Sequence, residues 1–250
     1  MGTLAWTRET RGLLRPRDRW SLLGQASLYG LATLSGETRR LLGVSRRRLA
    51  RVDASELVPP DSRICRDSER LVEEVTSPMV VNHCHRTYAW GAALAAQEER
   101  KYDKEVVYVA SLLHDLYFEN PRALGGPHCF TLPAADKAEA LGEAGGWDER
   151  RRSAAAEAIT LHLNLWPPRE SAEAYVVFIG ARLDVVGYRY WDLHPENVER
   201  VLERHPRLDL KRESIVGFNA QSAQNPGSRI HFYTRFLAGN WFTRRAPFSE

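Results

Sequence analysis

The sequence predicts an all-α protein. Apolar residues recur every three or four positions along most of the 250 residues, whereas the strict alternation typical of strands is scarce. Proline and glycine interrupt this pattern at intervals that suit short and medium helices. The apolar content of 43% and the charged content of 27% are those of an ordinary globular protein with a sizeable core. We therefore expect a helical bundle and exclude a largely disordered chain.

The N-terminal part is expected to form a helical extension. Its apolar pattern predicts two short helices separated by Ser35-Gly36. These helices span residues 21–34 and 38–49. Two consecutive prolines, at positions 59 and 60, mark the end of this part. The predicted division is an N-terminal helical extension of residues 1–57 and a main domain of residues 58–250.

Positive charge is concentrated in this extension. Residues 1–51 contain eleven arginines, no lysine and three acidic residues, a net charge of +8. The whole chain carries only +3, so the remainder carries −5. A total charge this close to neutral gives no reason to expect a polyanionic partner. We expect the arginines to pair with acidic side chains of the main domain, and we do not expect a nucleic-acid partner.

Nothing in the sequence indicates a membrane or an oxidising compartment. The longest apolar stretch, residues 88–96, is too short to span a bilayer, and the first residues lack an apolar segment of signal-peptide length. The three cysteines lie far apart without a CxxC pair, which predicts neither a disulfide framework nor a thiolate zinc site. We expect a cytoplasmic protein with no membrane partner, and we leave open whether it forms a homodimer.

The main domain is predicted to consist of helices separated by turns rich in proline and glycine. Asp103 can cap a helix that is apolar nearly all round, as a central helix would be. Ser171 can cap a later helix that carries Glu173 in its first turn. The expected helices span residues 62–75, 80–101, 103–115, 134–141, 148–163, 171–186, 197–203, 215–223 and 230–238, and an aromatic tail with Trp241 and Phe242 packs back on the body.

Polar side chains project from three of these apolar helices. His83 shares a helical stripe with Trp90, so it faces inward. His114 and Asp115 end the central helix, and Asp184 lies on the apolar face of a later one. Carboxylates in apolar surroundings need a compensating positive charge. Two imidazoles with two carboxylates can bind a divalent transition metal, with zinc the first choice and iron or manganese the alternatives.

The order of these residues resembles a known family. His83, the pair His114-Asp115 and Asp184 are similar to the H…HD…D signature of the HD superfamily, an all-helical metal-dependent fold. The resemblance covers about residues 58–238. It implies an HD-domain orthogonal helical bundle in which His83, His114, Asp115 and Asp184 are the metal ligands.

Three stretches most resemble the cyanamide hydratase branch of this superfamily. They are residues 81–88, 130–135 and 158–162. The pair Asn82-His83 matches the Asn-His opening of that family, which selects His83 over His85 as the ligand. Two residues correspond to about 200° around a helix of 3.6 residues per turn, so His85 faces away from the same ion.

The metal would hold a water, lower the pKa of that water and polarise the electrophile. The reaction also needs a nearby side chain that accepts and donates protons. His162 is the first candidate, because its helix directs it inward beside Ile159 and an imidazole titrates near neutral pH. We therefore name His162 and the ligand Asp115 as the candidate catalytic residues.

Aromatic residues after the His-Asp pair suggest an apolar pocket. Phosphohydrolases of the superfamily commonly have small or basic residues there, whereas this chain has Tyr117 and Phe118. Arg86 is placed to orient an anionic group or to pair with Glu119. With Asn82, these side chains are the candidate substrate-binding residues.

The resemblance and the pocket imply a metal-dependent hydratase or hydrolase. Its substrate would be a small, largely apolar organic molecule with a nitrile, cyanamide or amide-like C–N group. One alternative is a nucleotide or phosphoester phosphohydrolase, which the presence of only two lysines after residue 104 disfavours. The other is a binuclear iron oxygenase, because some HD proteins have extra histidines between the His-Asp pair and the final Asp, where this chain has His128 and His162.

Overall fold

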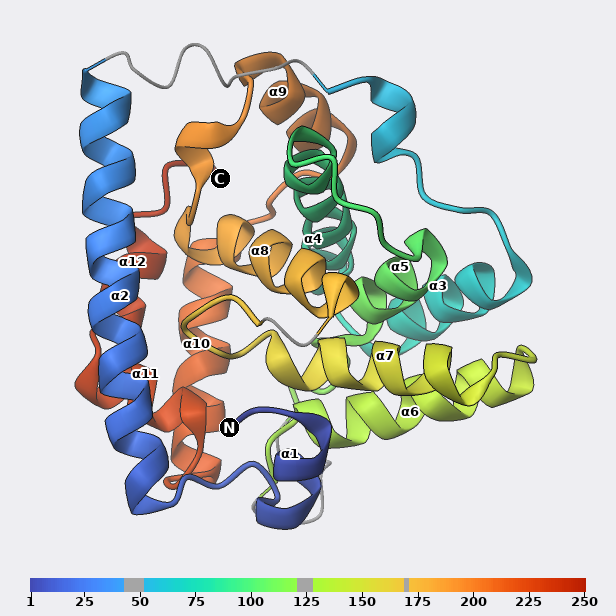
Figure 1. The fold of residues 1–250 in the computed structure, drawn as a ribbon, viewed down its shortest axis with the longest axis horizontal. Helices are drawn as coiled ribbons and strands as arrows, with labels where there is room; N and C mark the ends of the chain where they lie inside the picture. Colours follow the sequence, from blue (N-terminus) through green and yellow to red (C-terminus); the bar gives the residue numbers. More distant parts are fainter. Residues whose placement is uncertain (43–51, 121–127, 169–170) are drawn as a thin grey trace.

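The computed structural model describes residues 1–42, 52–120, 128–168 and 171–250. These residues form α-helices and two short 3-10 helices and contain no strand, which confirms the all-α prediction (Figure 1). The helices are α1 (Leu4–Thr10), α2 (Pro16–Leu41), η2 (Ala54–Leu57), α3 (Arg63–Val75), α4 (Pro78–Gln97), α5 (Lys104–Leu113), α6 (Thr131–Ala144), α7 (Glu149–Leu161), α8 (Ala172–Val186), η4 (Tyr190–Asp192), α9 (Pro195–Arg204), α10 (Leu210–Gln224), α11 (Arg229–Phe236) and α12 (Gly239–Arg244). No helix within these ranges is both long and apolar enough to cross a bilayer.

Helices α4 and α8 pack against each other at the centre of the molecule. Two glycines allow their backbones to approach closely. A Cβ atom added at Gly180 of α8 would lie only 1.9 Å from the carbonyl oxygen of Thr87, and one at Gly91 of α4 would lie 2.5 Å from that of Val176. This approach sets the N-terminal half of α4 beside the C-terminal half of α8.

Helix α5 runs through the core, as its apolar sequence predicts. All its residues from Val106 to Leu113 are buried. Its first turn is capped by Asp103, whose carboxylate accepts hydrogen bonds from the backbone N–H groups of Glu105 and Val106. Arg151 of α7 binds the same carboxylate at 2.8 Å. The C-terminal end of α5 thereby brings His114 and Asp115 to the centre of the bundle.

The N-terminal extension differs from the prediction. Helix α2 is continuous through Ser35-Gly36, where a break between two helices was expected. The physical reason is packing, because a Cβ at residue 36 would lie 2.1 Å from the ring of Trp191, so only glycine lets the helix lie against that ring. The part of the expected second helix beyond residue 42 lies outside the described residues. Arg8 of α1 pairs with Asp136 and Glu139 of α6.

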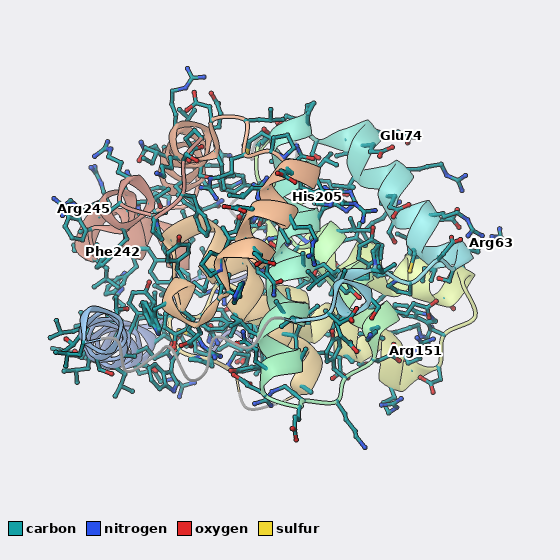
Figure 2. The ribbon with its side chains drawn as sticks, turned by 90° about the horizontal axis from the view of Figure 1, so that it is seen from above. Arg63, Glu74, Arg151, His205, Phe242 and Arg245 are labelled. Carbon is teal, nitrogen blue, oxygen red and sulfur yellow. The ribbon has the colours of Figure 1, made fainter. Side chains whose placement is uncertain are left out.

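The C-terminal helices α10, α11 and α12 lie on the same side of the molecule as α2, with α10 nearer to α8 (Figure 1). Helix α10 begins five residues earlier than expected, and the expected aromatic tail forms helix α12. Phe242 of α12 packs edge-on against Tyr29 of α2, with 6.0 Å between ring centroids. Figure 2 shows Phe242 and Arg245 on this side of the molecule, away from Arg63 of α3. Helix α2 from the N-terminal part and α12 from the C-terminal part therefore meet on one side of the bundle.

Candidate metal centre

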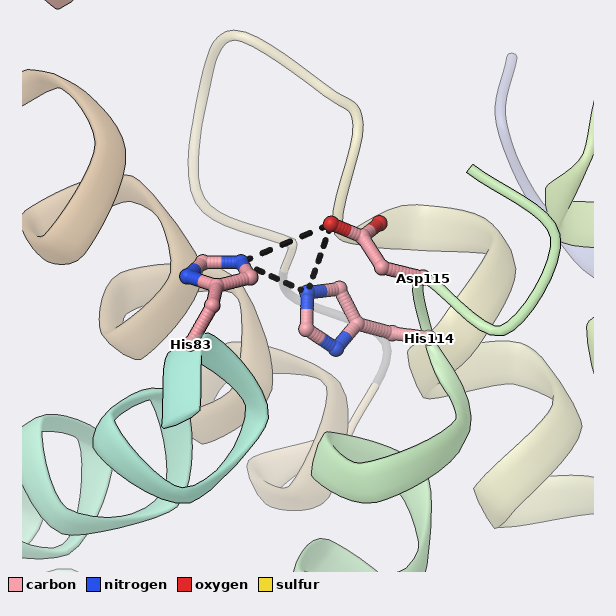
Figure 3. A group of neighbouring side chains, drawn as sticks. All are labelled: His83, His114 and Asp115. Atoms are coloured by element: carbon pink, nitrogen blue, oxygen red, sulfur yellow. Dashed lines mark hydrogen bonds and ion pairs between the residues drawn. The ribbon is translucent and has the colours of Figure 1, made fainter. Parts of the chain in front are cut away.

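Three side chains converge where α4 meets the end of α5 (Figure 3). Nε2 of His83 lies 3.2 Å from Nε2 of His114. Both of these nitrogens lie 3.5 Å from Oδ2 of Asp115. Among the described residues, these three form the one group of histidine, cysteine or acidic side chains compact enough to hold a metal ion. The donor set of two imidazoles and one carboxylate suits zinc, iron or manganese.

The carboxylate of Asp115 lacks a permanent positive partner. Its contacts are with the imidazoles of His83, His114 and His162, and no arginine or lysine of the described residues binds it. The residue is 9% exposed. A buried carboxylate without a cation is unfavourable, so a divalent ion fits this site electrostatically as well as by its donors.

Each imidazole is oriented by a partner on its outer nitrogen. Nδ1 of His83 lies 2.7 Å from Oδ2 of Asp184. Nδ1 of His114 donates to the carbonyl oxygen of Ser111 at 2.8 Å, since a carbonyl only accepts. Neutral histidines held in this way keep the lone pair of Nε2 free and directed inward, which is the form that binds metals.

Asp184 lies on the outer side of His83. The sequence resemblance implied a direct ligand, but the structure places this carboxylate at Nδ1 of His83 and outside the three converging atoms. Arg86 holds it with two hydrogen bonds of 2.8 and 2.9 Å. Trp90 donates to it at 3.0 Å and Arg207 at 3.2 Å. Its charge is thus compensated by two arginines without an ion.

The pKa values follow from these contacts. Burial favours the neutral forms, yet the surrounding imidazoles, His114 foremost, hold the pKa of Asp115 well below its ordinary range. Burial lowers the pKa of His114. For His83 burial acts in the same direction, but hydrogen bonds with Asp115 and Asp184 raise its pKa. Asp115 is therefore ionised at neutral pH and supplies a negative charge to the site.

His162 faces the same centre, as its helical position predicts. Its Nε2 lies 3.5 Å from Oδ1 of Asp115, and its ring meets that of His114 edge-on at 4.7 Å. Its Nδ1 donates to the carbonyl oxygen of Ile159 at 2.6 Å. Burial lowers the pKa of His162 to about 3, so the expected titration near neutral pH is not found. The side chain is neutral at pH 7, with Nε2 open to a proton.

An apolar cavity of about 310 Å³ adjoins the centre, and His83, His114, Asp115 and His162 form part of its wall. Most of the remaining wall comes from α2, α8 and the C-terminal helices. Its largest side chains are Tyr29, Phe130, Arg182, Phe218, Tyr233 and Phe242. Both ends of the chain therefore help to enclose the space in front of the candidate ligands.

Two of the expected substrate-binding residues lie outside this cavity. Arg86 is fully buried. Besides Asp184, it binds the carbonyl oxygens of His205 and Pro206, each at 2.9 Å, and not Glu119. Asn82 also donates to the carbonyl of Pro206, at 2.9 Å. Both side chains connect α4 to the turn after α9, because the unpaired carbonyls at the end of that helix need donors.

The other two, Tyr117 and Phe118, do not line the cavity either. Phe118 packs edge-on against Phe130 at 5.7 Å and against Phe218 at 5.2 Å. The backbone carbonyl of Tyr117 accepts a hydrogen bond from Gln221. The cavity does have an aromatic wall, but Tyr29, Phe130, Phe218, Tyr233 and Phe242 form it. Phe118 packs against Phe130 and Phe218 without lining the cavity.

His85 points away from the centre, as the helix geometry predicts. It lines a second cavity of about 220 Å³, where it stacks on His205 at 4.7 Å. Sequence reasoning did not assign Tyr29, Arg182 or Phe242 to the main cavity. No motif marks them, because helices far apart in the sequence bring them together.

A search of protein-family models finds none that matches the chain, and a search of curated proteins finds no match. Fold and site together define an all-α protein with a candidate site for a metal ion formed by His83, His114 and Asp115. Membership of the HD superfamily stays a prediction from the sequence.

Proposed function

We propose that this protein is a metal-dependent hydratase or hydrolase that adds water to a small, largely apolar organic substrate. The observation that supports the proposal is the convergence of His83, His114 and Asp115 on the wall of an apolar cavity. The substrate would carry a nitrile, cyanamide or amide-like C–N group, as the sequence resemblance implies. A bound divalent ion, zinc foremost and iron or manganese as alternatives, would activate water as a nucleophile and polarise the electrophile.

The side chains have separate tasks in this proposal. His83 and His114 offer Nε2, and Asp115 offers Oδ2, to hold the ion. Asp184 fixes the ring of His83 through Nδ1. His162 is neutral and accepts a proton at Nε2, which lies on the side of Oδ1 of Asp115. The aromatic cavity wall limits the access of bulk water to the reacting atoms.

Elemental analysis and an activity panel test the proposal together. Purified protein is expected to hold about one transition metal ion per chain. The metal-loaded protein should hydrate nitriles or cyanamide, or hydrolyse small amides, in preference to nucleotides and phosphodiesters. His162→Ala should retain the metal and lower kcat about 10²- to 10⁴-fold. Turnover of a nucleotide that is unaffected by His162→Ala would instead support a phosphohydrolase.

A second candidate is the binuclear iron oxygenase. One observation favours it: Asp115 presents Oδ2 to His83 and His114 and Oδ1 to His162. A carboxylate with both oxygens facing imidazoles is suited to bridging two ions. Two irons per chain and turnover that requires oxygen would select this candidate over the hydratase.

A further inference from the structure

Two arginines beside the main cavity have no acidic partner among the residues that the structure describes. Arg182 of α8 lines the cavity, and Arg229 of α11 is fully buried. Asn164 lies between them. Its backbone oxygen accepts from Nη2 of Arg182, and its Oδ1 accepts from Nη1 of Arg229, each at 3.0 Å. Neutral oxygens therefore satisfy these donors in part, and the two positive charges stay uncompensated.

Two other arginines of the core, Arg86 and Arg207, are almost fully buried, whereas Arg182 is half-buried, and they behave differently. Arg86 and Arg207 both bind the carboxylate of Asp184, and Arg207 also binds Glu250. This is the usual arrangement, because a guanidinium group removed from water requires an anion or a full set of acceptors. In contrast, the positive charges of Arg182 and Arg229, both beside the cavity, have no negative partner among the described residues.

Arg182 has donor capacity left over. Its Nε is buried and has no hydrogen-bond partner. The single hydrogen bond that the structure describes for this side chain is the one to Asn164. Its other contacts are faces of aromatic rings, with the guanidinium carbon 5.3 Å from the centroid of Tyr29 and 6.0 Å from that of Tyr233. Such contacts offset part of the charge but accept no conventional hydrogen bond.

We propose that Arg182 binds a carboxylate of the substrate, so that the substrate is a small apolar carboxylic acid. The acid group would lie at Arg182 and the reacting group at His83, His114 and Asp115, with the apolar part between them. This inference rests on the proposed function for the reacting group only. The imbalance of charge at Arg182 stands independently of that function.

Charge and size favour a carboxylate over a phosphate. Arg182 is the one arginine or lysine on the described part of the cavity wall, and the carboxyl group of Asp115 shares that wall. One guanidinium matches the single charge and the two oxygens of a carboxylate. A phosphate monoester, with a charge of about −2, would leave an excess of negative charge. The volume of about 310 Å³ corresponds to roughly ten water molecules, which suits a short-chain or single-ring acid.

Benzoate and benzamide are suitable probes, because they have nearly the same shape and differ in charge at pH 7. Calorimetric titration of the metal-loaded protein should give an affinity for benzoate at least tenfold higher than for benzamide. Arg182→Gln keeps a donor for the carbonyl of Asn164 and removes the charge. It should abolish the preference for benzoate while metal content stays unchanged. Arg182→Lys, which keeps the charge without the planar fork, should give an intermediate preference.

Two controls separate this inference from the proposed function. Arg235→Gln removes an exposed arginine of α11 that does not line the cavity and should leave both affinities unchanged. Metal removal by a chelator should leave the benzoate preference in place, because Arg182 and not the ion sets it. Equal affinities in the wild type, no binding of either probe, or a preference that survives Arg182→Gln but disappears with the metal would overturn the inference. Loss of metal binding alone would overturn only the proposed function.

Discussion

Whether a histidine can bind an ion at the candidate centre depends on the direction of its side chain and on the partner that its Nδ1 atom contacts. His83 and His85 belong to the same helix, yet they meet opposite environments. His83 has a carboxylate at Nδ1 and two side chains at Nε2, whereas His85 stacks on His205 in a separate cavity. The residue type alone therefore does not identify a ligand, and the direction of each side chain decides which histidine can bind an ion.

This difference predicts unequal effects of two alanine substitutions. His114→Ala removes one of three converging donors and should weaken metal binding by more than the roughly 10- to 100-fold expected for loss of an outer partner. His85→Ala, the matched control, should leave metal content near that of the wild type. Elemental analysis after dialysis against a weak chelator measures both. Loss of metal in His85→Ala with retention in His114→Ala would contradict the assignment of the centre.

Asp184→Asn tests whether this carboxylate acts through His83 or binds the ion itself. The substitution leaves Arg86 and Arg207 buried without their shared anion, so the free energy of unfolding should fall by about 3–5 kcal/mol. Metal affinity should fall by about 10- to 100-fold and not vanish, because Asp184 only orients His83. Denaturant unfolding of the metal-free protein and metal titration give the two values. Complete loss of metal with unchanged stability would show that Asp184 is a direct ligand, as the sequence resemblance implies.

The second cavity predicts a component of acid sensitivity. Burial, with the nearby His85, Arg204 and Arg86, lowers the pKa of His205 to about 4. Its ordinary pKa is about 6.5, so between pH 6.5 and 4 the unfolded chain binds more protons at His205 than the folded protein does. Stability should therefore fall as the pH falls through this range. His205→Asn should make that fall less steep in denaturant unfolding at several pH values, and an unchanged pH profile would contradict the prediction.

The geometry of the candidate site depends on how closely helices α4 and α8 approach each other, and not only on which segments are helical. The helical spacing of the sequence predicted that α4, α5 and α8 exist and that His83, His114 and Asp115 face inward. It did not predict how near α4 and α8 approach. Gly91 and Gly180 determine that distance. A glycine within a helical pattern has several explanations, so the contact was visible only once the partner helix was known.

Gly180→Ala tests this close approach. The added Cβ would lie 1.9 Å from the carbonyl oxygen of Thr87, so α4 and α8 must separate. We expect a loss of about 1–3 kcal/mol or more in the free energy of unfolding and weaker metal binding, because His83 moves relative to the end of α5. Gly24→Ala in α2, where a Cβ meets nothing within 4 Å, is the control and should be neutral or stabilising by up to about 1 kcal/mol. Equal effects of the two substitutions would contradict this account.

The cavity is formed by parts of the chain that were predicted from the sequence to belong to separate regions. The boundary expected after residue 57 placed α2 in an extension, yet Tyr29 of that helix lines the cavity with Phe242 from the opposite end of the chain. Periodicity identifies the buried face of each helix but not the face it meets. The candidate ligand cluster was predictable because helical spacing and the His-Asp pair mark His83, His114 and Asp115 as inward-facing, whereas the cavity wall depends on tertiary contacts that no local pattern records.

Helix α2 closes one side of the cavity through Tyr29. Tyr29 is 6% exposed, and its ring lies 5.1 Å from that of Tyr188 and below the guanidinium of Arg182. Tyr29→Ala should therefore lower the free energy of unfolding by about 3–5 kcal/mol. It should also speed hydrogen exchange along α2, because the helix loses its main aromatic contact with the body.

Trp20, on the same helix, provides the matched control. It is 76% exposed, so Trp20→Ala should change stability by no more than about 0.5 kcal/mol and leave exchange in α2 unaltered. Adding 1 M salt should affect neither variant strongly, since apolar and aromatic packing of Tyr29 holds α2 against the body. Release of α2 by salt alone, with Tyr29→Ala no worse than Trp20→Ala, would mean that surface charge attaches this helix and that the cavity is closed from the C-terminal side only.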